Sequence, residues 1–157
     1  IGSVHFIGDW NFDGDQSLYG KWSNDELYAI YFGLVQQAAS SRLFDTLGHL
    51  DLVKIFSVYP ESDLSPLFEE TARIISRSDV VVELNTGGLD RPCAEFYPGP
   101  QWLELLRTHD IPVTLSSDAH HPTQIARHYQ QAVSLLKKTG YHQIITFHDR
   151  KRIVLKI

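Results

Sequence analysis

The stretch DVVVEL, residues 79–84, decides the fold class of this chain. It holds three successive valines and a leucine, and Glu83, between Val82 and Leu84, is its only interior polar residue. A continuous apolar run of this length is typical of a strand buried on both faces, as in a parallel sheet. Parallel strands must be joined by crossover connections, which are usually helices. The stretch therefore predicts an α/β protein.

Strand and helix patterns alternate on both sides of this stretch. We expect further strands at residues 3–7, 44–49, 112–116, 144–147 and 152–157. We expect helices that begin after a cap at Ser23 or Asn24, at Ser65, at Gln101 and at Thr123, the last ending at Lys138. Two architectures fit this order, an open doubly wound sheet and part of a (β/α) barrel. No glycine-rich phosphate loop follows any strand, which favours the barrel.

Length, charge and composition restrict the possible classes of function. The 157 residues are enough for one domain, which we assign to residues 1–157. No apolar run approaches the roughly 20 residues of a membrane helix, and a net charge of −5 argues against a nucleic-acid surface. A single cysteine, Cys93, favours a reducing compartment, and we expect the cytoplasm. The chain opens on a strand pattern and contains no methionine, so we expect it to be N-terminally incomplete.

Residues of metal-binding type lie at or near the ends of the expected strands. His5 lies in the first strand, His49 ends the second, and Asp118 and His120 follow the strand at 112–116. In a parallel barrel the carboxyl ends of all strands share one rim, so we expect these four side chains to converge. Mixed histidine and carboxylate donors suit zinc, iron or manganese.

Each of these residues also has a simpler structural explanation. His49 alone is more often a hydrogen-bonded loop histidine, Asp118 alone a helix cap, and His5 a satisfied polar group of the core. Glu83 would pair with a buried base or orient a ligand, because an unpaired carboxylate in an apolar strand is costly. Arg91, in the loop after that strand, is a candidate for gripping a phosphate. It is the joint placement of the four residues that favours a metal site.

Five stretches resemble one family. They occur in the expected order over nearly the whole chain: GSVHFIGDW (2–10), FDTLGHLDLVK (44–54), VELNTGGL (82–89), EFYPGPQWL (95–103) and LSSDAH (115–120). Together they resemble the histidinol-phosphatase branch of the polymerase-and-histidinol-phosphatase (PHP) superfamily. The resemblance implies a distorted (β/α)7 barrel, of which this chain would be the C-terminal portion, with up to three divalent metals at its carboxyl-end rim.

The resemblance also implies a reaction and a set of roles. It implies hydrolysis of L-histidinol phosphate to L-histidinol and phosphate in histidine biosynthesis. His5, His49, Asp118 and His120 would be metal ligands, with Asp118 and His120 essential to catalysis. The family's opening His-x-His strand, a later histidine and a glutamate ligand have no counterpart here. The family often has a basic residue directly after the leucine of NTxGL, whereas this chain has Asp90 and then Arg91.

For the substrate we expect carboxylates near the rim, because histidinol carries an amine and an imidazole. Asp9 is our candidate partner, with Trp10 as a wall of the pocket, and Arg91 would contact the phosphate. The partner is therefore a small phosphorylated metabolite. Two alternatives remain open: another PHP phosphoesterase that acts on nucleotides or small phosphorylated metabolites, and a non-catalytic metal-binding domain. The metal content of the purified protein distinguishes the non-catalytic domain from the two kinds of phosphoesterase.

Overall fold

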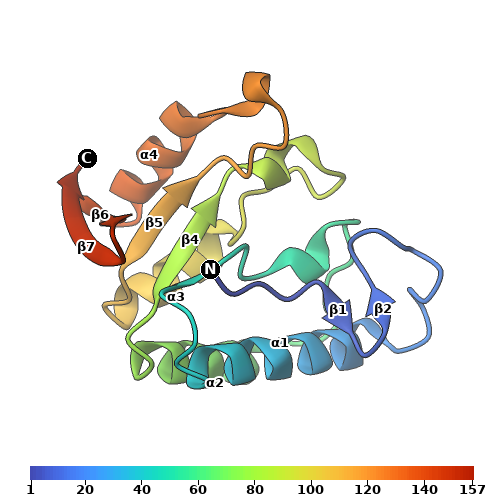
Figure 1. Cartoon of the computed structure of the whole chain (residues 1–157). Helices are drawn as coiled ribbons and strands as arrows, with labels where there is room; N and C mark the ends of the chain where they lie inside the picture. Colours follow the sequence, from blue (N-terminus) through green and yellow to red (C-terminus); the bar gives the residue numbers. More distant parts are fainter.

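A three-stranded parallel sheet forms the centre of the molecule, which a computed structural model describes over residues 1–157 (Figure 1). Its strands are β3 (Thr46–Leu47), β4 (Val81–Asn85) and β5 (Val113–Ser116), in the spatial order β3-β4-β5. All five residues of β4 are buried, as expected for a strand covered on both faces. The prediction of an α/β protein with a parallel sheet is confirmed.

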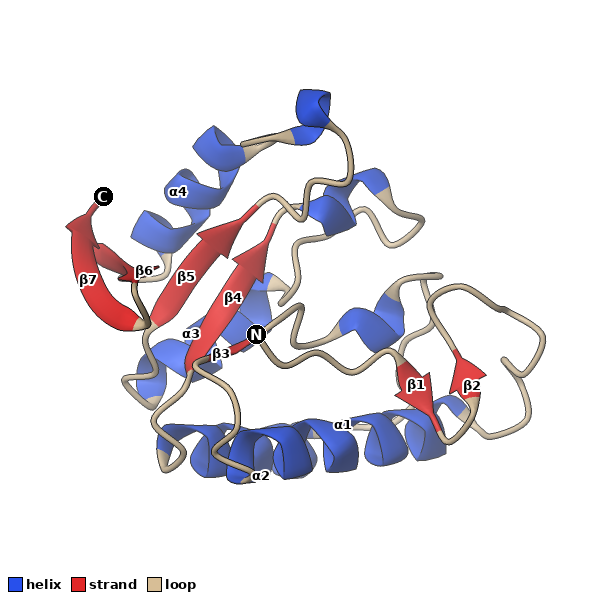
Figure 2. Ribbon diagram, viewed as in Figure 1, coloured by secondary structure: helices blue, strands red, loops and turns tan.

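Four helices pack around the sheet: α1 (Asn24–Ser40), α2 (Ser65–Ser76), α3 (Pro100–Thr108) and α4 (Tyr129–Lys138). Figure 2 shows α1 and α2 running side by side below the sheet and α4 above it. The predicted cap of α1 is confirmed, because the Ser23 hydroxyl accepts a hydrogen bond from the Glu26 amide and the Glu26 carboxylate accepts one from the Ser23 amide. This reciprocal pair is a capping box.

Aromatic side chains hold the first three helices together. Phe32 of α1 stacks on Trp102 of α3 with ring centroids 5.0 Å apart. Phe68 of α2 lies 5.0 Å from Trp102 and 5.2 Å from Phe32. Pairs of this kind add about 0.5–1.5 kcal/mol each beyond the burial of their area. The cluster thereby fixes α3, whose N-terminus carries the loop that follows β4.

The expected strand at residues 3–7 is wrong in extent and in partner. Only β1 (Phe6–Ile7) is a strand, and it pairs antiparallel with β2 (Trp10–Asn11). Gly8 has a φ of +60°, so the chain reverses directly after β1. Gly2 alone reaches the parallel sheet, through a bridge to Leu47. His5 therefore lies between the sheet and the β1–β2 hairpin.

Two other expected elements are too long. The helix expected at residues 123–138 begins only at Tyr129, after a short 3₁₀ helix, η3 (Pro122–Gln124). Ala126 and His128 have φ values of +59° and +58°, which an α-helix cannot contain. The strand expected at residues 44–49 is shortened to β3, because His49 also has a positive φ, of +27°.

The C-terminal hairpin is confirmed. Strands β6 (Gln143–His148) and β7 (Lys151–Lys156) pair antiparallel around Asp149 and Arg150. Both turn residues have positive φ values, +49° and +61°, the pattern of the tight turn that suits the twist of a hairpin. The hairpin packs beside β5 but forms a sheet of its own.

The parallel sheet is not closed into a barrel, since β3 and β5 remain its edges. Two 3₁₀ helices, η1 (Leu52–Lys54) and η2 (Gly87–Asp90), follow the carboxyl ends of β3 and β4. They turn the chain away from the sheet at the edge where the candidate site lies. None of the helices is both long and apolar enough to cross a lipid bilayer.

Candidate functional site

The carboxyl ends of the three parallel strands carry buried polar side chains. His49 follows β3 and is only 6% exposed, while Glu83 and Asn85 of β4 are 5% and 1% exposed. Asp118 follows β5 by two residues. The parallel register, in which Asn85 pairs with Ser116, places these strand ends at one edge. The predicted rim is therefore present for these residues.

Glu83 ties the first two strand ends together. Its Oε2 accepts hydrogen bonds from the backbone amide of His49 at 2.8 Å and from Asn85 Nδ2 at 3.1 Å. Asn85 in turn accepts the amide of Gly87 at 2.8 Å through its Oδ1. The buried carboxylate is thus satisfied by protein groups, and it orients the segment that carries His49.

His5 and His49 meet at this edge of the sheet. Their ring centroids lie 4.7 Å apart in an edge-to-face arrangement. His5 Nδ1 donates to Asp13 Oδ2 at 2.9 Å, which leaves Nε2 as the unprotonated nitrogen of the neutral ring. Burial lowers the pKa of His49, and the neighbouring His5 acts in the same direction, whereas Glu83 and Asp118 oppose them. The low pKa favours a neutral imidazole, the form that binds metals.

Asp118 and His120 form the outer part of the site. Asp118 has a φ of +48°, and its amide donates to Ser116 Oγ at 3.1 Å. His120 Nδ1 donates to the carbonyl of Asp118 at 2.9 Å and lies 3.9 Å from its Oδ1. The His120 ring is 75% exposed, so it stands at the mouth of the site while His49 lies at its base.

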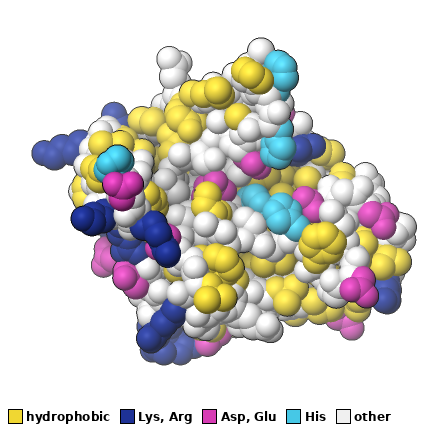
Figure 3. All heavy atoms as spheres, viewed as in Figure 1, with side chains coloured by type: hydrophobic (Ala, Val, Ile, Leu, Met, Phe, Trp, Pro, Cys, Tyr) yellow, Lys and Arg dark blue, Asp and Glu magenta, His cyan; other side chains and the backbone are white.

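The four residues fit the donor chemistry of a divalent metal without forming a finished cage. No group of three or more histidine, cysteine or acidic side chains is arranged to hold a metal ion. However, His49 Nδ1 is buried and has no hydrogen-bond partner. His5 and His120 each donate through Nδ1 to an oxygen, which is the arrangement that presents Nε2 to a metal. Figure 3 shows histidine and acidic side chains together on this face.

The predicted substrate residues lie in different places. Arg91 is exposed and directly follows η2. Asp9 and Trp10 line a cavity of about 600 Å³ together with Lys21 and Trp22, and His5 does not line it. Trp10 is buried and donates through Nε1 to the carbonyl of Asp15. The structure does not bring Asp9 and Trp10 next to the histidines.

Three residues of this region were not predicted from the sequence. Asp13 holds His5, while Arg127 and Asp90 lie behind the segment of Asp118. Asp13 lies in a loop rich in aspartate, asparagine and glycine, where nothing distinguishes it from its neighbours. Arg127 falls in the segment expected to be helical, so its side chain could not be assigned to the rim.

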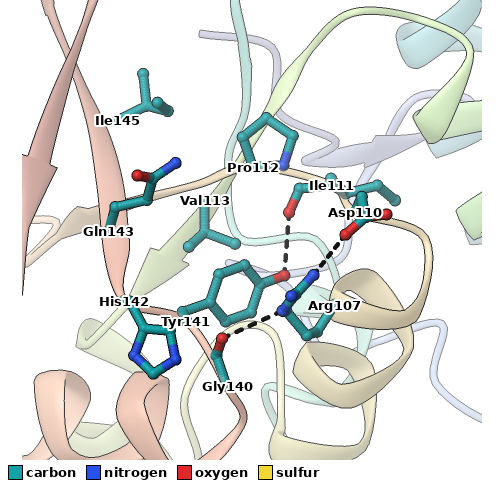
Figure 4. Close-up of a pocket in the computed structure, with 10 residues that line it drawn as sticks. All are labelled: Arg107, Asp110, Ile111, Pro112, Val113, Gly140, Tyr141, His142, Gln143 and Ile145. Atoms are coloured by element: carbon teal, nitrogen blue, oxygen red, sulfur yellow. Dashed lines mark hydrogen bonds and ion pairs between the residues drawn. The ribbon is translucent and has the colours of Figure 1, made fainter.

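A further cavity lies away from this edge. It measures about 350 Å³ and is lined by the end of α3, the start of β5 and the turn before β6. Figure 4 shows Tyr141 donating to the carbonyl of Ile111 and Arg107 donating to Gly140 and Asp110 inside it. It is thus at the amino end of β5, opposite the candidate site.

The curated proteins that are similar to this chain are named as histidinol-phosphatases. The chain is 36% identical over 154 residues to a probable histidinol-phosphatase of Deinococcus radiodurans, covering 96% of this chain and 58% of that protein. It is 24% identical over 157 residues to a histidinol-phosphatase of Lactococcus lactis, again covering 58% of the relative. No family model matches the chain.

A solved structure supports the fold. The crystal structure of histidinol phosphate phosphatase from Lactococcus lactis, in complex with zinc, L-histidinol and phosphate, aligns with a TM-score of 0.72 at 24% identity. The alignment covers 96% of this chain and 60% of that one. The resemblance read from the five stretches is confirmed, and the chain spans 58% of the length of each of these two curated relatives.

Proposed function

From the premise that this chain is homologous to the histidinol-phosphatases of the PHP superfamily, we propose that it carries part of the active site of a metal-dependent phosphomonoesterase. The reaction is hydrolysis of L-histidinol phosphate to L-histidinol and phosphate. The observation that carries the proposal is the convergence of His5 and His49, with ring centroids 4.7 Å apart, beside Asp118 at the carboxyl edge of the sheet.

Four residues of the rim would bind the metal. His5 and His120 would bind through Nε2, His49 through its unpartnered Nδ1, and Asp118 through its carboxylate. A bound divalent metal would lower the pKa of a coordinated water and stabilise the charge of the phosphate oxygens. We propose zinc, iron or manganese, with up to three ions in the complete site.

Three further residues are the proposed contacts to the substrate. Arg91 is the proposed contact to the phosphate, because it is exposed just beyond the rim and its guanidinium can bind two oxygens at once. Asp9 and Trp10 are the proposed contacts to histidinol. They belong to the β1–β2 hairpin, which begins directly after His5, so a substrate that extends from His5 along this hairpin would reach Asp9.

The same proposal includes the complete barrel architecture and the cellular compartment. We propose that the sheet is part of a distorted (β/α)7 barrel within one domain, of which residues 1–157 form the C-terminal portion. The support is that the site lies at the carboxyl ends of parallel strands, as in such barrels. A cytoplasmic enzyme that acts on a small phosphorylated metabolite, without nucleic acid or membrane, fits the acidic charge of −5 and the single cysteine.

Phosphate release and metal content test this function together. In the protein that contains this chain, Asp118→Ala and His120→Ala should abolish phosphate release from L-histidinol phosphate and reduce bound zinc measured by mass spectrometry. His148→Ala, on the exposed end of β6, is the matched histidine control and should change neither. Full turnover in either rim variant would refute the proposal. Faster release from a nucleoside monophosphate would instead favour another PHP phosphoesterase.

A further inference from the structure

Arg127 occupies an unusual position behind the proposed metal site. It precedes α4 and lies in the stretch where Ala126 and His128 both have positive φ. Its side chain is only 16% exposed. Figure 1 shows this stretch beside the segments that follow β4 and β5, and hydrogen bonds join all three.

The guanidinium binds the backbone that presents Asp118. Nε donates to the carbonyl of Ser117 at 3.0 Å, and Nη2 donates to the carbonyl of Asp118 at 3.3 Å. The amide of Asp118 is held from the other side by Ser116 Oγ. Asp118 adopts a φ of +48°, in the left-handed region that is uncommon for residues other than glycine but that aspartate tolerates. The hydrogen bonds of Arg127 to the carbonyls of Ser117 and Asp118 help to hold this conformation.

Asp90 fixes the guanidinium in turn. Its Oδ2 accepts from Arg127 Nη1 at 3.0 Å, and its Oδ1 accepts from His128 Nε2 at 2.9 Å. The backbone of Arg127 is held as well, since its carbonyl accepts from the buried Thr86 hydroxyl at 2.8 Å. The planar fork of arginine is therefore in contact with acceptors from two different loops.

Gly87 leaves the space in which the guanidinium lies. A Cβ at this position would come within 2.7 Å of Arg127 Nη2 and 3.4 Å of Asp118 Cβ. The glycine thus allows the loop after β4, the guanidinium and the segment of Asp118 to approach one another. Three of the five N–H groups of Arg127 are already bound to protein oxygens, so the side chain is built into the scaffold.

We propose that Arg127, locked by Asp90, is a positioning residue that sets the orientation of the Asp118 carboxylate toward the metal. This inference rests on the proposed function, since it assigns Arg127 to the same site. Arg127 acts through the backbone of Ser117 and Asp118 and touches neither metal nor substrate. Partners that orient a metal ligand typically change metal affinity or activity by about 10–100-fold when they are removed.

Zinc affinity is the main test, measured by competition with a chromophoric chelator in the protein that contains this chain. Arg127→Ala should weaken zinc binding by about tenfold or more. Arg127→Lys should not restore it, because a lysine ammonium cannot bridge two carbonyls and a carboxylate in one plane. The Asp90→Asn variant keeps one acceptor oxygen and should lie between Arg127→Ala and wild type. Arg77→Ala, an exposed arginine that ends α2, is the control and should bind zinc as wild type does.

Kinetics separate positioning from direct contact with the phosphate. A positioning role lowers kcat for L-histidinol phosphate at saturating substrate while KM changes by less than about threefold. Unchanged zinc affinity in folded Arg127→Ala and Asp90→Asn proteins would overturn the inference, as would a raised KM with normal zinc binding. Full recovery by Arg127→Lys would also overturn it, since charge alone would then suffice.

The outcomes distinguish this inference from the proposed function. If wild-type protein binds zinc but releases no phosphate from L-histidinol phosphate, while zinc binding still depends on Arg127, the function fails and the positioning role stands. If hydrolysis is confirmed but zinc binding does not depend on Arg127, only the inference fails. If wild-type protein binds no zinc, iron or manganese, both fail.

Discussion

Glu83 shows how a single buried carboxylate can serve the site without belonging to it. Its Oε2 accepts from the His49 amide and from Asn85 Nδ2, and it is 5% exposed. Glu83→Ala would leave both donors buried without an acceptor, which costs about 1–3 kcal/mol for each unsatisfied group. We therefore expect Glu83→Ala to lower the free energy of unfolding, measured in urea, by about 2 kcal/mol or more.

The comparison variant for this prediction is Glu83→Gln. A glutamine keeps one amide oxygen at nearly the same place, so it should retain most of the stability that Glu83→Ala loses. If glutamine is as destabilising as alanine, the negative charge rather than the acceptor holds this strand end, and the interpretation of Glu83 would have to change.

At the residue scale, the sequence predicts the centre of the site better than its support. His49, Asp118 and Glu83 could be placed because parallel strands bring their carboxyl ends to one edge. Asp13 and Arg127 could not, because their roles depend on long-range contacts to His5 and to the segment of Asp118. No periodicity or spacing in the sequence records such contacts.

At the scale of elements, local signals predict boundaries only where local chemistry sets them. The start of α1 follows from the Ser23 and Glu26 capping box, and the turn of the C-terminal hairpin from Asp149 and Arg150. The late start of α4 does not follow, because residues 126–128 are held out of helical geometry by hydrogen bonds to the segments that follow β4 and β5. Ala126, for example, donates its amide to Ser117 Oγ at 3.2 Å.

The C-terminal hairpin is tied to the sheet by an ion pair that should depend on pH. Arg150 binds both carboxylate oxygens of Asp45 at 3.0 and 3.1 Å, and this hydrogen bonding lowers the pKa of Asp45. A lowered folded-state pKa stabilises the fold above the unfolded value, near 3.9, and the contribution is lost as the pH falls through the folded value. The pair is exposed, so the effect will be modest.

The test compares melting temperatures of wild type and Asp45→Asn between pH 7 and pH 3. The melting temperature of wild type should exceed that of Asp45→Asn by a constant difference down to about pH 4. Below this pH the difference between the two melting temperatures should decrease. Glu104→Gln, an exposed carboxylate change on α3, should show no such trend. A margin that stays constant to pH 3 would mean that Asp45 does not act through its charge.

At the scale of the whole molecule, the three sheets differ in how well they are covered. The parallel sheet is enclosed by helices and the loops of its carboxyl edge, and β4 is fully buried. All six residues of β7 are exposed, including Ile153, Val154 and Leu155 at 42%, 54% and 45%. Consecutive apolar residues cannot all face one side of a strand, so both faces of β7 present apolar surface.

This uncovered strand should make the chain self-associate when it is studied by itself. β7 pairs only with β6, and its free edge offers unpaired backbone groups beside apolar side chains, a combination that promotes strand pairing between molecules. Sedimentation velocity on residues 1–157 should show a mass that rises with concentration, and Val154→Lys should shift it toward the monomer. Leu43→Lys replaces a leucine that is 73% exposed outside the hairpin and should leave association unchanged. If wild type stays monomeric at all concentrations, or if Leu43→Lys acts as strongly as Val154→Lys, β7 is not the surface through which the chains associate.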